Sequence, residues 1–223
     1  MKKHILEIDS VQKSFDTKSI LSDVYLKCET ADIIGLLGRN GSGKSTLLKI
    51  IFGIEAADFK FVRLDGIVKT STKDLFQEIS YLSQESFIPN HFTVTKAISL
   101  SIAKNKLDEF YQDEFIQSLK DKKVSHLSGG ELRYLDIKLI LKKPSYFVLL
   151  DEPYNGLSPL MIEQVNHLIR THSHEKGIVI TDHNYENVIA TATKLILIKD
   201  GKAHHLNNHS ELVEKGYLCE GIV

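Results

Sequence analysis

Short runs of apolar residues recur along this chain, and each run is bounded by turn-forming or charged residues. Short, largely apolar runs of this length are typical of strands buried on both faces of a parallel sheet. With helical segments between them, they predict an α/β fold built on a mostly parallel core sheet. The runs lie at residues 33–37, 79–82, 146–150, 177–181 and 194–198.

Other parts of the chain have different patterns. Residues 4–9, 23–28 and 61–68 look like strands, and we expect them to form antiparallel pieces that cover one side of the core sheet. The segment from about Ser86 to Ser125 is richer in lysine, aspartate and glutamate, and its apolar residues recur at helical spacing. This segment predicts a small helical lobe.

No linker separates these parts, so the sequence predicts a single domain over residues 1–223. Its core lobe is expected at residues 1–85 and 146–223, and its helical subdomain at about 86–145. A chain of 223 residues with 42% hydrophobic residues is long enough and apolar enough to build a substantial core.

Composition narrows the class of protein. The formal net charge is −1, which leaves no basic footprint for a nucleic-acid partner. No apolar run approaches the roughly 18–20 residues that cross a membrane, and the N-terminus has no signal-peptide pattern. Cys28 and Cys219 have no metal-ligand spacing, so we expect ordinary reduced thiols. A soluble, cytoplasmic protein is the expectation.

A glycine-rich segment follows the apolar run at 33–37 and leads into another at 47–52. Its pattern, G-x-x-x-x-G-K-S/T between a strand and a helix, is that of a phosphate-binding loop, which distinguishes it from an ordinary glycine-rich turn. Lys44 would reach the β- and γ-phosphates, and Ser45 would hold Mg²⁺. Contacts to the nucleotide are expected from Gly38, Asn40, Gly41, Ser42, Gly43, Lys44, Ser45 and Thr46.

Polar side chains follow three other buried runs. Gln84 comes after the run at 79–82, Asp151 and Glu152 end the run at 146–150, and His183 follows the run at 177–181. Ligands of open α/β sheets bind at the carboxyl ends of the strands, where these residues are expected. Taken singly, such residues are more often helix caps or solvated loop residues. Their combination with a phosphate loop favours an active site.

A further glycine-rich segment, Leu127-Ser128-Gly129-Gly130-Glu131, precedes an apolar helical pattern at Leu132–Leu141. The order of all these motifs along the chain resembles that of the ATP-binding cassette (ABC) ATPase family. The resemblance covers the chain from about Ile5 to Gly201. It implies a P-loop NTPase with a RecA-like core sheet, an antiparallel β subdomain and a small helical subdomain carrying the signature loop.

The resemblance also implies roles for the site residues. Glu152 is the candidate base for water attack on ATP, and Asp151 would hold Mg²⁺ directly or through water. Gln84 can offer its amide oxygen to Mg²⁺ or to the water. His183 could hydrogen-bond the γ-phosphate. Phe15 stands where the family places an aromatic ring that stacks on adenine, although such a residue can instead pack into the core.

The signature loop has its role in a pair of cassettes. In the family two cassettes pair head to tail, and Ser128, Gly129 and Gly130 of one contact the γ-phosphate held by the other. The pair is a homodimer or a heterodimer with a second cassette. Tyr134 stands where the family usually has arginine, which leaves the packing of the helical lobe open. Ser158 stands where the family often has aspartate. Serine lacks the charge of aspartate, so we expect weaker or different communication across the dimer.

Two functions remain open from the sequence. The first is the ATP-hydrolysing subunit of a transporter, peripheral on the inner face of the cell membrane and bound to a separate transmembrane permease. In motif style the chain looks most like cassettes of lipopolysaccharide export and branched-chain amino-acid import. The permease would dock near residues 84–90, where Phe87, Ile88 and Pro89 form an apolar turn that can equally belong to the core. The second is a soluble ATPase of an assembly system, such as iron–sulfur cluster assembly. A nucleotide-binding scaffold without turnover is disfavoured because Lys44, Glu152 and His183 are all present.

Overall fold

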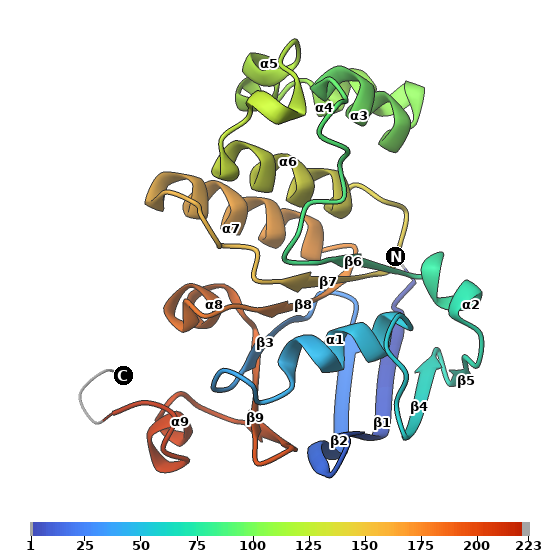
Figure 1. Ribbon diagram of the computed structural model, residues 1–223, viewed down its shortest axis with the longest axis vertical. Helices are drawn as coiled ribbons and strands as arrows, with labels where there is room; N and C mark the ends of the chain where they lie inside the picture. The colour runs from blue at the N-terminus through green and yellow to red at the C-terminus, as the bar shows by residue number, and fades with distance from the viewer. Residues whose placement is uncertain (1, 220–223) are drawn as a thin grey trace.

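The computed structural model describes residues 2–219, and it places two sheets of different kinds against each other (Figure 1). Residue 1 and residues 220–223, at the ends of the expected domain, lie outside the described part. The antiparallel sheet has the order β2-β1-β4-β5, and the larger sheet has the order β10-β9-β3-β8-β7-β6. The strands of the antiparallel sheet are β1 (Ile5–Phe15), β2 (Lys18–Glu29), β4 (Phe59–Leu64) and β5 (Ile67–Val68).

In the larger sheet all neighbouring strands run parallel except β10 and β9, which are antiparallel. Its strands are β3 (Ile33–Leu37), β6 (Ile79–Leu82), β7 (Phe147–Asp151), β8 (Gly177–Thr181), β9 (Lys194–Lys199) and β10 (Lys202–Leu206). Every residue of β3, β7 and β8 is buried, as the uninterrupted apolar runs predict. The α/β fold class is thereby confirmed.

Helices cover both faces of the larger sheet. Helix α1 (Lys44–Phe52) packs between the two sheets, in a core that it shares with residues such as Leu6 and Val179. Helices α6 (Gly129–Leu141), α7 (Pro159–Ser173) and α8 (Tyr185–Thr191) contribute to the core on the opposite face. The other α-helices of the described residues are α2 (Thr72–Phe76), α3 (Val94–Ser101), α4 (Leu107–Phe110), α5 (Glu114–Leu119) and α9 (Ser210–Glu214), and short 3-10 helices lie at Lys104–Lys106 and Val124–His126.

The helical segment between β6 and β7 carries α3, α4, α5 and α6, and it stands at one end of the molecule (Figure 1). Its buried residues, Ile98 and Ile116 among them, share one hydrophobic core with the sheet residues Val148 and Ile178. The segment is therefore not packed as a separate folding unit. Within residues 2–219, no helix is both long and apolar enough to cross a membrane.

The structure differs from the sequence expectations at some boundaries. The single strand expected at 61–68 is two strands, because the chain turns at Asp65 and Gly66, both with positive φ. The helix expected from Leu132 begins at Gly129. Tyr134 packs well without an arginine, since its hydroxyl donates a hydrogen bond to Asp113 at 2.7 Å. Cys28 is a buried free thiol and Cys219 an exposed one.

Candidate functional site

The glycine-rich loop connects the carboxyl end of β3 to α1, as a phosphate-binding loop requires. Gly43 caps α1 with φ 100°, in the left-handed region that favours glycine. A side chain at Gly43 would also meet Leu21 at 2.8 Å, so the backbone lies directly on β2. The helix N-terminus and the backbone N–H groups of the loop together favour an anion there.

Side chains of the loop are arranged for phosphate contact. The Lys44 amino group donates hydrogen bonds to the carbonyl oxygens of Gly38 and Arg39, at 2.7 and 3.2 Å. Burial lowers the pKa of Lys44, and the carboxylates of Glu152 and Asp151 oppose that shift. The buried Ser42 hydroxyl has no hydrogen-bond partner among the described residues. An unpartnered hydroxyl beside a helix N-terminus fits a nucleotide phosphate.

Asp151 and Ser45 lie together at the end of β7. The Ser45 hydroxyl donates to Asp151 Oδ1 at 2.9 Å, and the Tyr81 hydroxyl donates to Asp151 Oδ2 at 3.0 Å. Burial and the neighbouring Asp151 raise the pKa of Tyr81, which therefore stays a proton donor. Hydroxyl and carboxylate oxygens are ligands that Mg²⁺ prefers, so this pair fits a magnesium site completed by phosphate oxygens.

The Glu152 carboxylate is the meeting point of the other strand-end residues. Its Oε1 accepts a hydrogen bond from Gln84 Nε2 at 2.8 Å and lies 2.8 Å from His183 Nε2. Gln84 thus presents its amide N–H to the carboxylate, in addition to the amide oxygen that the sequence offers to Mg²⁺ or water. The three residues come from the ends of β6, β7 and β8, at the same edge of the sheet as the phosphate loop.

Glu152 has an unusual backbone. Its φ is 51°, in a region that non-glycine residues rarely occupy, and Glu152 N–H donates to Thr181 O at 2.7 Å. Left-handed backbone of this kind costs roughly 1 kcal/mol or more and clusters at functional sites. The turn aims the carboxylate toward Gln84 and His183.

The signature loop begins α6. Ser128 caps the helix, and its side chain and that of Glu131 form a reciprocal capping box. Ser128 and Gly129 are exposed, whereas Gly130 is buried; a side chain at Gly130 would lie 3.1 Å from the Gly156 carbonyl oxygen. Helices α6 and α1 contribute to cores on opposite faces of the sheet, and Gly129 lines a small cavity with Gln84 and Gly156.

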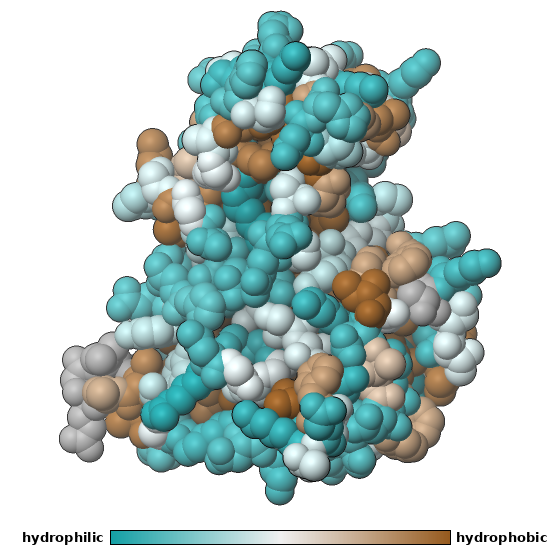
Figure 2. Space-filling model, in the orientation of Figure 1, coloured by the Kyte–Doolittle hydropathy of each residue, from teal (hydrophilic) through white to brown (hydrophobic). Residues whose placement is uncertain are grey.

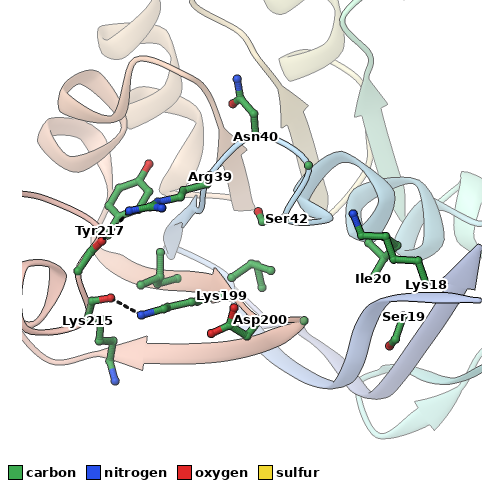
Figure 3. A pocket seen from close by; sticks show the side chains of 15 residues that line it. Lys18, Ser19, Ile20, Arg39, Asn40, Ser42, Lys199, Asp200, Lys215 and Tyr217 are labelled. Carbon is green, nitrogen blue, oxygen red and sulfur yellow. Dashed lines mark hydrogen bonds between the residues drawn. The ribbon is translucent and has the colours of Figure 1, made fainter.

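A cavity of about 380 Å³ lies beside the phosphate loop. Figure 3 shows it bordered by residues 39–42, by the turn between β9 and β10, and by the start of β2. Phe15 pairs with Lys18 across the β1–β2 turn and is 46% exposed, so it does not fill the core. The Lys13 amino group lies 4.5 Å from the centroid of its ring. Charged residues lining the cavity are mostly cationic: Lys18, Arg39, Lys199 and Lys215, with Asp200.

The sequence of the chain carries the signature of a known family. The family described as ABC transporter matches residues 21–155, which is more than half of the chain and includes the phosphate loop, Asp151 and Glu152. The chain belongs to the ABC transporter family. This ABC cassette is accordingly an ATPase with the ABC-ATPase fold.

Individual proteins to which this cassette is similar are also ABC proteins. The cassette is 31% identical to the lipopolysaccharide export system ATP-binding protein LptB of Haemophilus influenzae, over 89% of this chain and 88% of that protein. It is also 31% identical to ABC transporter A family member 11 of Dictyostelium discoideum, but it spans only 27% of that longer protein. A solved ATP-binding subunit of an ABC transporter has the same fold, with a TM-score of 0.84 and 16% identity over 96% of this chain and 94% of that one.

Two residues that hydrogen-bond the site residues of this ABC cassette were not identified from the sequence. Tyr81 lies in β6 beside Leu82 and its hydroxyl bonds Asp151, and Arg133 lies in α6 next to Tyr134 and Leu135. A polar residue inside an apolar pattern was the available signal in both cases. The hairpin β9–β10 was also missed, because its second strand contains His204 and His205 and lacks an apolar run.

Proposed function

We propose that this chain is the ATP-hydrolysing subunit of an ABC transporter and powers transport through a separate membrane-spanning subunit. The observation that carries the catalytic part is the meeting of Gln84 and His183 on one oxygen of Glu152. In this arrangement Glu152 orients or deprotonates the attacking water, and His183 hydrogen-bonds the γ-phosphate. Phe15 stacks on the adenine at the mouth of the neighbouring cavity.

The magnesium ion belongs to the same proposal. Ser45 and Asp151 hold it, with Gln84 as a further oxygen ligand for the metal or its water. Bound there, Mg²⁺ would neutralise negative charge on the β- and γ-phosphates. Among the described residues no three histidine, cysteine or carboxylate side chains form a metal cluster of their own, which suits an ion held largely by phosphate.

Pairing of two cassettes completes the proposed site. Ser128 and Gly129 are exposed at the start of α6, on the face of the sheet opposite α1, so a phosphate on a second cassette is the natural partner for them. The pair is a homodimer or a heterodimer with a second cassette, and ATP joins its halves. Residues 86–145 act as the helical subdomain that presents this loop.

A membrane partner is supported by the relatives and by the surface. The LptB proteins, which match along nearly their whole length, are named as ATP-binding proteins of an export system. Apolar residues gather beside the end of α1 and α2 (Figure 2), where Ile54 and Phe76 are exposed and Phe76 packs on Phe52. Near residues 84–90, Ile88 is buried in the core while Phe87 is exposed. We place the docking site for the membrane-spanning subunit near residues 84–90, on the cytoplasmic face of a membrane.

The deciding experiment uses a trapped form of the protein. Glu152→Gln keeps the hydrogen-bonding shape but removes the base, so turnover should fall by about 100-fold or more while ATP binding and the ATP-bound dimer persist. Normal turnover in this variant would show that Glu152 is not the base.

The same variant, tagged and expressed in its own cell, identifies the partner. With ATP and Mg²⁺ present, a multi-span membrane protein should co-purify from detergent-solubilised membranes, and the control Lys44→Ala/Glu152→Gln should capture much less. Capture of soluble partners alone would contradict a transporter subunit and favour an assembly ATPase.

A further inference from the structure

Arg133 is the buried cation that joins the signature helix to the catalytic edge of the sheet. It lies in α6, five residues after Ser128, and only 6% of it is exposed. Burying a charged side chain is unfavourable unless the protein gains specific hydrogen bonds from it. An arginine at such a position therefore calls for an explanation beyond helix packing.

The hydrogen bonds of Arg133 supply that explanation. Its Nη1 donates to the carbonyl oxygen of Ser83 at 2.7 Å, one residue before Gln84. Its Nη2 donates to the carbonyl oxygens of Asp151 at 2.6 Å and Glu152 at 2.8 Å. One planar guanidinium thus binds the backbone at the ends of two neighbouring strands, and its fixed fork sets the distance between them.

The contact to Glu152 falls on the strained part of the backbone. Glu152 keeps its positive φ with its N–H bonded to Thr181 O and its carbonyl bonded to Arg133. Strained conformations persist only where surrounding contacts over-determine them. Arg133 is one of three hydrogen-bond contacts to this backbone, with Thr181 O and the Asn155 N–H at 3.3 Å, and it is the one that comes from the signature helix α6.

We propose that Arg133 is a positioning residue for ATP hydrolysis, holding Glu152 and the Gln84 loop in catalytic geometry from the signature helix. The inference rests on the proposed role of Glu152 as the base. A movement of α6 that follows contact between the signature loop and the partner's nucleotide would be transmitted directly to the carboxylate. Each ATP site of a pair would then respond to the occupancy of the other.

The test compares two buried cations of the same helix. Arg133→Lys keeps the charge but loses the fork, and Arg133→Gln serves if the lysine variant folds poorly. Lys138→Met is the matched control, because Lys138 bonds Asp113 in the helical segment and has no hydrogen bond or ion pair to the catalytic strand ends. For each variant, kcat, the KM for ATP and the melting temperature are measured.

Arg133→Lys should lower kcat by about 10-fold or more and leave the KM for ATP within about 2-fold, because phosphate binding is untouched. In gel filtration with ATP and Mg²⁺, the Arg133→Lys dimer should also persist for longer after mixing than the wild-type dimer, as is expected for Glu152→Gln. Lys138→Met should lower the melting temperature at least as much, with kcat near the wild-type value.

The inference is overturned if Arg133→Lys has the wild-type kcat. It is also overturned if kcat falls in proportion to the melting temperature to the same extent in Arg133→Lys and Lys138→Met. Glu152→Gln is assayed in parallel to separate the two proposals. If Glu152→Gln is inactive and Arg133→Lys is normal, only the inference about Arg133 fails. If Glu152→Gln turns over normally, the catalytic proposal itself fails.

Discussion

At the scale of single residues, two of the side chains that would meet ATP, Lys44 and Ser45, are bonded to protein groups that the ligand can replace. Lys44 donates to two carbonyl oxygens of its own loop, and Ser45 donates to Asp151. These bonds hold the side chains in place before ATP binds. Exchanging them for bonds to ATP is favourable, because a phosphate oxygen is a stronger acceptor than a carbonyl. The loop is thus preorganised for its ligand, which reduces the ordering cost of binding.

Lys44→Ala tests this at one position. Removing a charge-assisted hydrogen bond to phosphate is worth about 1.5–3 kcal/mol, so ATP affinity should fall by roughly 10- to 100-fold. The measurement is a binding titration with a fluorescent ATP analogue. Lys49→Ala, an exposed lysine of the same helix, is the control and should bind as the wild type does. Equal affinity of both variants would contradict the phosphate contact of Lys44.

At the scale of elements, the start of α6 is fixed by polar contacts at its exposed end. Glu131 accepts from the Ser128 N–H at 2.7 Å and from Lys122 at 2.8 Å, and these interactions hold its pKa below the ordinary value. A capping box satisfies N–H groups that the helix leaves unpaired. The loop that is proposed to meet the partner's nucleotide is therefore held by its own helix. Ser158, in the position where aspartate is common, likewise caps α7.

Variants of Glu131 separate its cap from its charge. Glu131→Gln can still accept from Ser128, so its free energy of unfolding should stay within about 0.5 kcal/mol of the wild type. Glu131→Ala loses the cap, and its free energy of unfolding should fall by about 1 kcal/mol. Thermal melts should show a drop of roughly 2–4 °C for the alanine variant alone. A drop of similar size in both would assign the effect to the ion pair with Lys122.

At the scale of the whole molecule, one buried carboxylate links stability to pH. Burial raises the pKa of Asp136 to about 6, against a hydrogen bond from Ser86 and the charge of Arg133. Because the folded pKa is raised, the native state binds this proton more tightly than the unfolded chain does. Its contribution to stability therefore increases as pH falls from about 7 toward the unfolded pKa near 4.

Asp136→Asn should remove this part of the pH dependence. From pH 7 to pH 5 the wild type should gain about 1 kcal/mol of unfolding free energy relative to the variant. Urea denaturation of both proteins at the two pH values gives the difference, and all other titrating groups cancel in it. Parallel changes in the two proteins would show that Asp136 has an ordinary pKa.

Much of the fold could be predicted because the buried strands are short and largely apolar. The runs at 33–37, 79–82 and 177–181 coincide with β3, β6 and β8. The longer β1 and β2 could not be delimited, since their pairing shifts register near Ser10 and Asp23, where φ is positive. Irregular strands of this kind interrupt the alternation on which sequence reasoning depends.

Some residues of the candidate site could be predicted from the sequence and others could not. The phosphate loop, Gln84, Glu152 and His183 could be chosen from the sequence because each follows a buried strand, and parallel strands bring their carboxyl ends to one edge. Their role in catalysis remains a prediction. Tyr81 and Arg133 could not be chosen, because their significance lies in contacts across elements far apart in the sequence. Spacing along the chain carries no record of such contacts.

The position of the helical segment within the fold has a consequence for how such proteins diverge. The chain leaves the sheet at the carboxyl end of β6 and returns to it at the amino end of β7. These strands are parallel neighbours, with Ile79 opposite Phe147 and Leu82 opposite Leu150, so the segment crosses from one end of the strand pair to the other. An excursion that is anchored at both ends by paired strands can change in the helices before α6 while the sheet and the contacts of Arg133 stay intact. Such a layout lets evolution refit the surface that chooses a partner and leave the phosphate-handling machinery unchanged.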